Sequence, residues 1–182
     1  MNFKINNRYL LTFGVIILCM VTFSDLKAQA QVNEKAEAKA FVKKFYDWYV
    51  PLSNKPIDRK NPVSPIAVLK QRPEYFDEPL RKAFLDDAAA QAKYPGELVG
   101  LDFDPFLDAN DNVLGYKLGN VKQVGNKFQI EVSVGDHIIA EVMKAGGSWK
   151  FTNFFYPNNK QYTLLQVLAS LRNGREKMKP NK

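Results

Sequence analysis

The pattern that most limits the fold of this chain lies between residues 114 and 151. Short runs of alternating apolar and polar residues are separated there by Gly125-Asn126, Gly135-Asp136 and Gly146-Gly147. Such alternation is typical of strands with one buried face, and glycine-led pairs suit tight hairpins because glycine adopts positive φ without strain. The apolar positions are Leu114, Tyr116, Leu118, Phe128, Ile130, Val132, Val134, Ile138, Ala140, Val142, Trp149 and Phe151. This pattern predicts a four-stranded antiparallel meander, with a bulge at Gly119-Asn120.

The longest helical pattern runs from residue 34 to residue 50. Its apolar positions form one stripe: Ala38, Phe41, Val42, Phe45, Trp48 and Tyr49. Asn33 can cap its start, and Pro51 is expected to end it because the proline ring clashes with the preceding turn. Burying a large apolar side chain contributes roughly 1.5–3 kcal/mol, so this helix is predicted to lie across the main core.

Three further helices are indicated by their caps and breaks. Ser64 and Asp77 suit the starts of two helices that end near residues 71 and 93, and a last helix is expected over residues 161–172, with Gly174 as its stop. In the helix after Asp77, the expected buried residues are Leu80, Phe84 and Leu85, and the expected exposed ones are Asp86 and Asp87. Helices on either side of a meander predict an α+β domain: N-terminal helices packed on a curved sheet, plus a C-terminal helix.

Residues 1–30 have the pattern of a cleavable secretory signal. A basic leader precedes an apolar run over residues 9–23, and small residues precede a cleavage point after Ala30. The run is shorter than the about 20 residues that a membrane span needs, so a single-pass anchor is the weaker alternative. We therefore expect a secreted, periplasmic chain with no integral span after cleavage. The one cysteine, Cys19, would leave with the signal, which excludes thiol catalysis for the mature chain.

A single α+β domain is expected over residues 31–174, because about 150 residues bury enough surface to fold without disulfides. The formal net charge is +7, and part of it lies in residues 175–182, which we expect to form a disordered basic tail. Contact between this tail and an anionic surface is the alternative to simple solvation. No nucleic-acid-binding motif is present, so nucleic acid is not an expected partner.

Several segments carry a family resemblance. They are Phe41 to Tyr49 (Phe-Val-Lys-Lys-Phe-Tyr-Asp-Trp-Tyr), Asp104-Pro105-Phe106, Gly146-Gly147-Ser148-Trp149-Lys150-Phe151 with its continuation to Phe154, and the leucine-rich last helix. Over roughly residues 36–172 the chain resembles the nuclear-transport-factor-two-like superfamily, and within it a bacterial envelope family of unknown function with lipoprotein-like relatives. The resemblance implies a cone, or cystatin-like fold, with a cleft at its wide end. Catalytic members place an aspartate and tyrosines in that cleft, whereas many other members only bind.

Residues 101–108 hold the most unusual carboxylates. Asp102 and Asp104 alternate with apolar residues, so in an extended segment they would share one side, where two close carboxylates can divide acid and base roles. The candidate catalytic residues are Asp102 or Asp104 as base and Tyr116 or Tyr46 as hydrogen-bond donor. The alternative interpretation is that Phe106 and its neighbours pin the loop while the aspartates cap turns. The candidate cleft-lining residues are Trp48, Tyr49, Phe106 and Trp149.

No metal or cofactor is expected. Asp108, Asn110 and Asn112 match three ligand positions of a calcium loop, but Val113 stands where that loop needs glycine. His137 is the only histidine, which disfavours a zinc site. The lack of a chemical constellation favours a non-enzymatic ligand- or protein-binding module. The alternative is a small-molecule isomerase, dehydratase or hydrolase, and the partner is left open between a small ligand, an envelope protein and a second copy paired through the sheet.

Overall fold

A computed structural model describes most of the chain. The described residues are 7–55, 64–94, 99–109, 113–134, 136–158 and 162–177. The chain divides into two units, Met1–Glu37 and Ala38–Lys182, and α1 (Asn7–Ser53) contributes to both. Within these described ranges, no helix combines the length and the apolar character that crossing a membrane requires.

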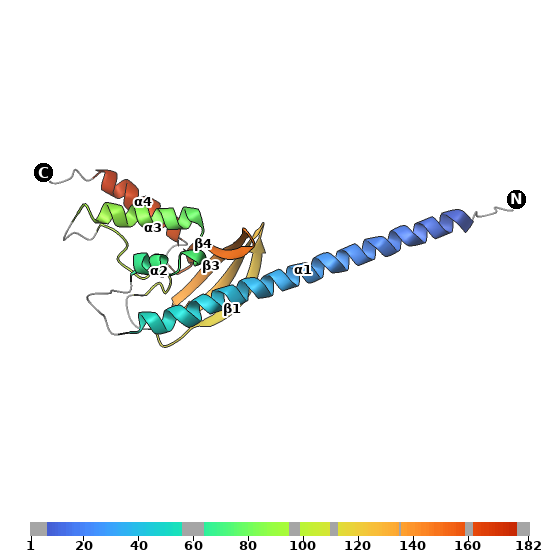
Figure 1. The fold of residues 1–182 in the computed structure, drawn as a ribbon, viewed down its shortest axis with the longest axis horizontal. Helices are drawn as coiled ribbons and strands as arrows, with labels where there is room; N and C mark the ends of the chain where they lie inside the picture. The colour runs from blue at the N-terminus through green and yellow to red at the C-terminus, as the bar shows by residue number, and fades with distance from the viewer. Residues whose placement is uncertain are drawn as a thin grey trace. The chain divides into compact units, whose positions relative to one another are not determined.

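The second unit contains an antiparallel sheet with its strands in chain order (Figure 1). The strands are β1 (Lys117–Val124), β2 (Lys127–Val134), β3 (Asp136–Ala145), β4 (Ser148–Tyr156) and β5 (Tyr162–Thr163). Together with the helices, this sheet confirms the α+β fold and the meander. The short β5 was not predicted; it pairs with the end of β4 through Phe155 and Tyr156.

Two hairpin turns have the backbone geometry that glycine favours. Gly125 has φ 62°, and Gly146 and Gly147 have φ 58° and 77°. These values confirm the predicted turns, whereas Gly135 lies outside the described residues. The register of β1 against β2 shifts between Leu118 and Val121, which confirms the predicted bulge.

A second bulge, in β4, was not predicted. Asn153 pairs with Glu141 and Phe151 pairs with Val142, so Thr152 is the extra residue of this strand. Because of it, Phe151 and Phe154 both bury completely although they are three residues apart. Strict alternation along β4 would have sent one of the two away from the core.

The predicted apolar stripe of α1 lies in the core. Phe45 is fully buried, and its ring centroid lies 4.9 Å from that of Phe151 in β4. The predicted ends of this helix are wrong: α1 begins before Asn33 and continues through Pro51 to Ser53. The side chain of Asn54 holds the last turn, because it accepts a hydrogen bond from the backbone N–H of Val113 and donates one to its carbonyl.

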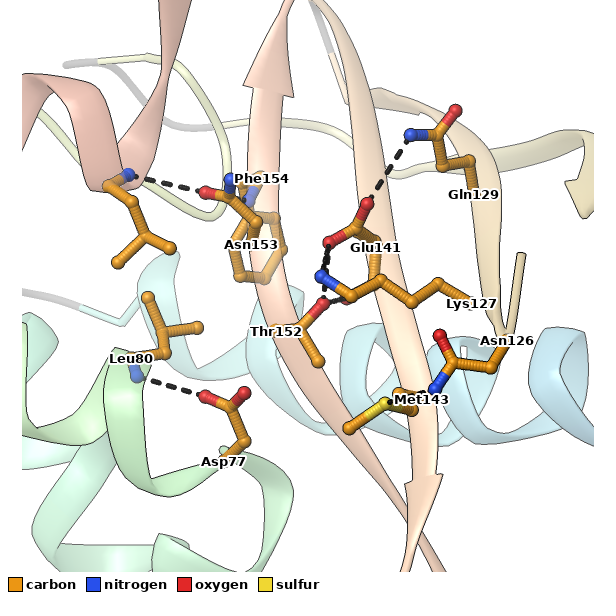
Figure 2. Close-up of polar contacts among 11 residues, drawn as sticks. Asp77, Leu80, Asn126, Lys127, Gln129, Glu141, Met143, Thr152, Asn153 and Phe154 are labelled. Atoms are coloured by element: carbon orange, nitrogen blue, oxygen red, sulfur yellow. Dashed lines mark hydrogen bonds and ion pairs between the residues drawn. The ribbon is translucent and has the colours of Figure 1, made fainter. Parts of the chain in front are cut away.

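The middle helices have the predicted caps. Ser64 Oγ accepts a hydrogen bond from Ala67 N at the start of α2 (Pro65–Gln71), and Asp77 Oδ1 accepts one from Leu80 N at the start of α3 (Glu78–Gln91; Figure 2). Between them lies the short 3₁₀ helix η1 (Pro73–Tyr75). The N–H of Asp77 also donates to the carbonyl of Phe151 at 3.0 Å, so the start of α3 covers part of the edge of β4.

The last helix, α4 (Leu164–Lys177), starts and ends later than predicted. Gly174 lies inside it and Arg175, which the prediction placed in a disordered tail, is only 7% exposed; residues 178–182 lie outside the described residues. The expected faces of α3 are also partly wrong, because Leu85 is 51% exposed and Asp87 only 6%. The burial of Asp87 and that of Arg175 have one cause, an ion pair between the two residues that joins α3 to α4.

Candidate functional site

The segment from Asp104 to Ala109 forms a tight turn in the second unit. Asp104 N donates to Ala109 O at 3.3 Å, Asp108 N donates to Asp104 O at 2.8 Å, and Asp108 has a positive φ of 48°. The Asp104 carboxylate serves the same turn, because its Oδ1 accepts a hydrogen bond from Phe106 N at 2.9 Å. This is the local hydrogen bonding for which aspartate is common in turns.

Three tyrosine hydroxyls hold this turn from other elements. Tyr46 donates to Phe106 O at 2.8 Å, Tyr156 donates to Pro105 O at 2.9 Å, and Tyr49 donates to Asp104 Oδ2. Burial raises the pKa of all three hydroxyls and also that of the Asp104 carboxyl, whose hydrogen bonds offset the burial only in part. Both oxygens of Asp104 are therefore used within the protein, in a contact that fastens the turn.

Phe106 lies at the centre of the aromatic core. It is fully buried, and its ring centroid lies within 5.2–5.9 Å of those of Phe45, Tyr49, Phe76, Phe84 and Phe154. Tyr49, also proposed to line a cleft, is 1% exposed. At these two positions, other side chains of the protein occupy the space that a ligand would need.

The two tryptophans are partly buried and belong to separate ring contacts. Trp48 stacks on Tyr75 with centroids 6.5 Å apart, and the Arg72 guanidinium lies 5.3 Å from its ring. The Trp149 ring, in β4, packs against the Phe128 ring, in β2, with centroids 5.4 Å apart. The two tryptophans predicted to line one cleft therefore pack against different rings.

Tyr116 lies beside α1. Its hydroxyl donates to Asp47 Oδ1 at 2.5 Å and contacts Lys43 O at 3.1 Å, while its ring lies 5.4 Å from that of Tyr46. Hydrogen bonds from Lys43 and Tyr116 lower the pKa of the Asp47 carboxyl, and burial together with Asp47 raises the pKa of the Tyr116 hydroxyl. Asp102 is exposed and makes no hydrogen bond to another residue of the described ranges. Asp104 is thus bonded to Tyr49, and the rings of Tyr46 and Tyr116 lie together. Neither of the two candidate bases, Asp102 and Asp104, is paired with Tyr116.

We expect Asp104→Asn to remove part of the pH dependence of stability. Since burial raises the folded-state pKa of Asp104 above its ordinary value of 3.8, the folded state holds this proton more tightly than the unfolded state. The contribution of Asp104 to the free energy of unfolding therefore falls as pH rises from about 4 through the folded pKa. Urea unfolding at pH 4 to 7 should show the variant gaining on the wild type as pH rises. Asp102→Asn, at the exposed neighbour, is the control; equal pH profiles for wild type and Asp104→Asn would contradict the prediction.

A second polar cluster, which the sequence did not predict, lies on the sheet. Glu141 of β3 is only 7% exposed, and its Oε1 accepts hydrogen bonds from Lys127 Nζ and Thr152 Oγ1, both at 2.7 Å (Figure 2). Gln129 donates to the other oxygen at 3.4 Å. A hydroxyl bonded to a carboxylate has the geometry of a nucleophile and its base, but here the ammonium of Lys127 neutralises the carboxylate. The cluster joins three strands across the bulge at Thr152.

A groove lies between α3 and α4, which run side by side (Figure 1). Its volume is about 220 Å³. Its lining consists of Ala83, Asp86, Asp87, Ala90, Leu165, Leu168, Ala169, Arg172 and Arg175. Small side chains on α3 and leucines on α4 give it apolar walls, and each helix adds a pair of charged residues.

The buried ion pair lies in the lining of this groove. Arg175 Nη1 donates to Asp87 Oδ1 and to Val99 O, both at 2.6 Å, and Asp87 Oδ2 accepts from Leu101 N at 3.3 Å. Arg175 Nε is buried and has no hydrogen-bond partner among the described residues. The groove therefore combines apolar walls with a buried ion pair, Asp87 with Arg175.

Helical spacing contains the signal that was missed. Ala83, Asp87 and Ala90 follow one another at i, i+4 and i+7, so Asp87 shares the face of α3 that carries the small residues. Arg172 and Arg175 likewise continue the face of α4 that begins with Leu165 and Leu168. Because charged residues were expected to face solvent, the positions of Asp87 and of the two arginines on these helix faces were not recognised.

Within the described ranges, no group of three His, Cys, Asp or Glu side chains could hold a metal ion. The predicted match to a calcium loop falls partly on residues 110–112, which lie outside those ranges. His137 lies in β3, opposite Ser133 of β2.

Comparison with known proteins does not assign this chain to a family. No protein-family model matches the chain, and no curated protein matches it. Among solved structures, a chain in the crystal structure of the type VI effector–immunity complex Tae3–Tai3 from Ralstonia pickettii is similar to this one. The two are 17% identical with a TM-score of 0.43, and the match covers 63% of this chain and 92% of that chain.

Proposed function

We propose that this protein is a non-enzymatic binding module of the bacterial envelope. The observation that carries the proposal is the groove between α3 and α4, which has apolar walls and charged residues in its lining. Apolar walls with a few convergent polar groups are the usual features of a small-molecule site. The groove is small, at about 220 Å³, so it suits a compact ligand.

An enzymatic role has less support from the candidate residues. Asp104 gives one oxygen to Phe106 N and the other to Tyr49, and Tyr46 gives its hydroxyl to a backbone carbonyl. A general base needs a substrate proton within hydrogen-bond reach. Asp104 and Tyr46 instead use their hydrogen bonds to hold a turn whose central residue, Phe106, is fully buried.

Pairing of two copies through the sheet edge has less support than ligand binding. The free edge strand β1 carries Lys117 and Lys122 and contains the bulge near Gly119. Charged residues and bulges on an edge strand oppose the addition of another strand. A small ligand is therefore the partner that we favour.

The envelope location and the superfamily remain part of the proposal. The signal-like pattern of residues 1–30 supports export and cleavage after Ala30, and the segments around Phe41, Asp104 and Trp149 support membership in the nuclear-transport-factor-two-like superfamily. Helix α1 crossing the core of a meander is the arrangement that such membership implies.

We expect the protein recovered from a bacterial envelope fraction to carry a small molecule. Full-length chain is expressed in a Gram-negative host, purified without detergent and measured by mass spectrometry. The denatured mass should correspond to a chain that starts at Gln31, and the native mass should exceed it by one small ligand. A mass that includes residues 1–30 would contradict the export proposal. Ligand-free protein that also acquires nothing from an envelope extract would contradict the binding proposal.

A further inference from the structure

We propose that Gln31 becomes the N-terminal residue on export and then cyclises to pyroglutamate, so that the mature chain has a blocked and uncharged N-terminus. This inference rests on the proposed export with cleavage after Ala30. It adds a covalent modification that the proposed binding function does not involve.

The reaction needs an N-terminal glutamine and no second reactant. The α-amino nitrogen of Gln31 attacks Cδ of the same side chain, and the new N–Cδ bond closes a five-membered lactam. The bond between Cδ and Nε2 breaks, and ammonia leaves with the proton that the attacking amine gives up. The nucleophile and the carbonyl belong to one residue, so the attack is intramolecular. An α-amino group titrates close to neutral pH, so part of it is the neutral nucleophile there.

The structure places Gln31 where this attack has room. Gln31 lies in α1 and is exposed. From Gln31 onward, the first buried residue of α1 is Ala38, which has no exposed surface. Residues 31–37 therefore precede the core in the chain. Because helix ends fray and termini that are not held by burial are poorly ordered, the side chain of a new first residue can turn back onto its own amine.

The charge at the start of the shortened helix favours the lactam. Cleavage after Ala30 places a positive amine at the N-terminus of α1, where the helix macrodipole is itself positive. Cyclisation removes this charge. Glu34, three residues further on, then provides a negative charge in the first turn without a competing amine beside it.

The exposed segment gives the modification a consequence that can be measured. Aminopeptidases need a free α-amino group, and an exposed, poorly ordered terminus is where proteolysis concentrates. Because burial begins at Ala38, trimming of residues 31–37 would not have to unfold the core. A lactam blocks the first cleavage and so protects the whole segment.

The test is mass spectrometry of the full-length chain expressed in a Gram-negative host and recovered from the envelope fraction. After incubation at neutral pH, the denatured mass should lie about 17 Da, one ammonia, below that of residues 31–182. Gln31→Asn is the matched control, because its side chain keeps the amide but is one methylene too short to close a five-membered lactam. This variant should keep its full mass. An added aminopeptidase should shorten it toward Ala38 and leave the wild type intact.

A wild-type chain that starts at Gln31, keeps its full mass after incubation and is trimmed like Gln31→Asn would overturn the inference while the export proposal stands. A chain that still contains residues 1–30 would overturn both. Neither result bears on whether the recovered protein carries a ligand, so the binding proposal is judged separately.

Discussion

Phe106→Ala is expected to lower the free energy of unfolding by about 3–5 kcal/mol, the usual range for removing a buried phenylalanine ring. The ring is fully buried, and the rings that surround it come from α1, from Phe76 before α3, from α3 itself and from β4. Because these partners belong to different elements, they cannot close over the cavity without moving a helix against the sheet. Collapse of the site should therefore recover little of the loss.

Urea unfolding followed by far-ultraviolet circular dichroism measures this loss. Phe106→Leu keeps most of the volume and should cost about 1.5 kcal/mol or less, so it provides a folded reference if the alanine variant does not fold. Phe103→Ala is the matched control on the same loop, because Phe103 is only partly buried and its ring contacts that of Tyr156. A loss below about 1 kcal/mol for Phe106→Ala, or an equal loss for Phe103→Ala, would show that Phe106 is not the centre of the core.

The sheet was predictable because its signal is local. Phe128, Ile130, Val132 and Val134 alternate strictly along β2, and all four are at most 2% exposed. The turns at Gly125 and Gly146 require positive φ, and glycine itself indicates such a position because it adopts positive φ without strain. The starts of α2 and α3 were predictable for the same reason, since Ser64 and Asp77 act on N–H groups only three residues away.

The errors arose where tertiary contacts override local preference. Proline normally ends a helix, yet α1 passes Pro51 and ends at Ser53, next to Asn54, whose side chain is bonded to Val113, 59 residues away. The bulge at Thr152 follows from the pairing of Glu141 with Asn153 and of Val142 with Phe151, which no single strand reveals. Such contacts cannot be predicted from either segment alone, because they depend on how the two segments pack against each other.

The candidate site was predictable only in part. The unusual character of Asp104 was visible in the sequence, and the interpretation that it caps a turn while Phe106 pins the loop matches the hydrogen bonds and the burial. The role of Tyr49, Tyr46 and Tyr156 as donors to this turn depends on two distant elements, α1 and β4. The groove was missed because it forms between two helices that are about 75 residues apart in the chain.

Asp87→Asn is expected to lower the free energy of unfolding by about 3–5 kcal/mol, since it leaves a buried arginine without its counter-charge. Arg175 is 7% exposed, so water cannot replace the lost carboxylate without opening the contact between α3 and α4. Asp86→Asn is the matched control at the next residue. Asp86 pairs with Lys82 on the surface, where the Asp86 side chain is 49% exposed, and such pairs contribute about 0–1 kcal/mol.

The double variant Asp87→Leu with Arg175→Met separates the charge from the geometry. Removing both charges abolishes the uncompensated charge, so it should cost less than the sum of Asp87→Leu and Arg175→Met, with a coupling energy of about 2 kcal/mol or more in urea unfolding. It should still cost something, because Val99 O and Leu101 N lose their partners, at about 1–3 kcal/mol for each buried group left unpaired. Additive losses would mean that the two residues act independently. In that case α3 and α4 are held together by their apolar contacts alone.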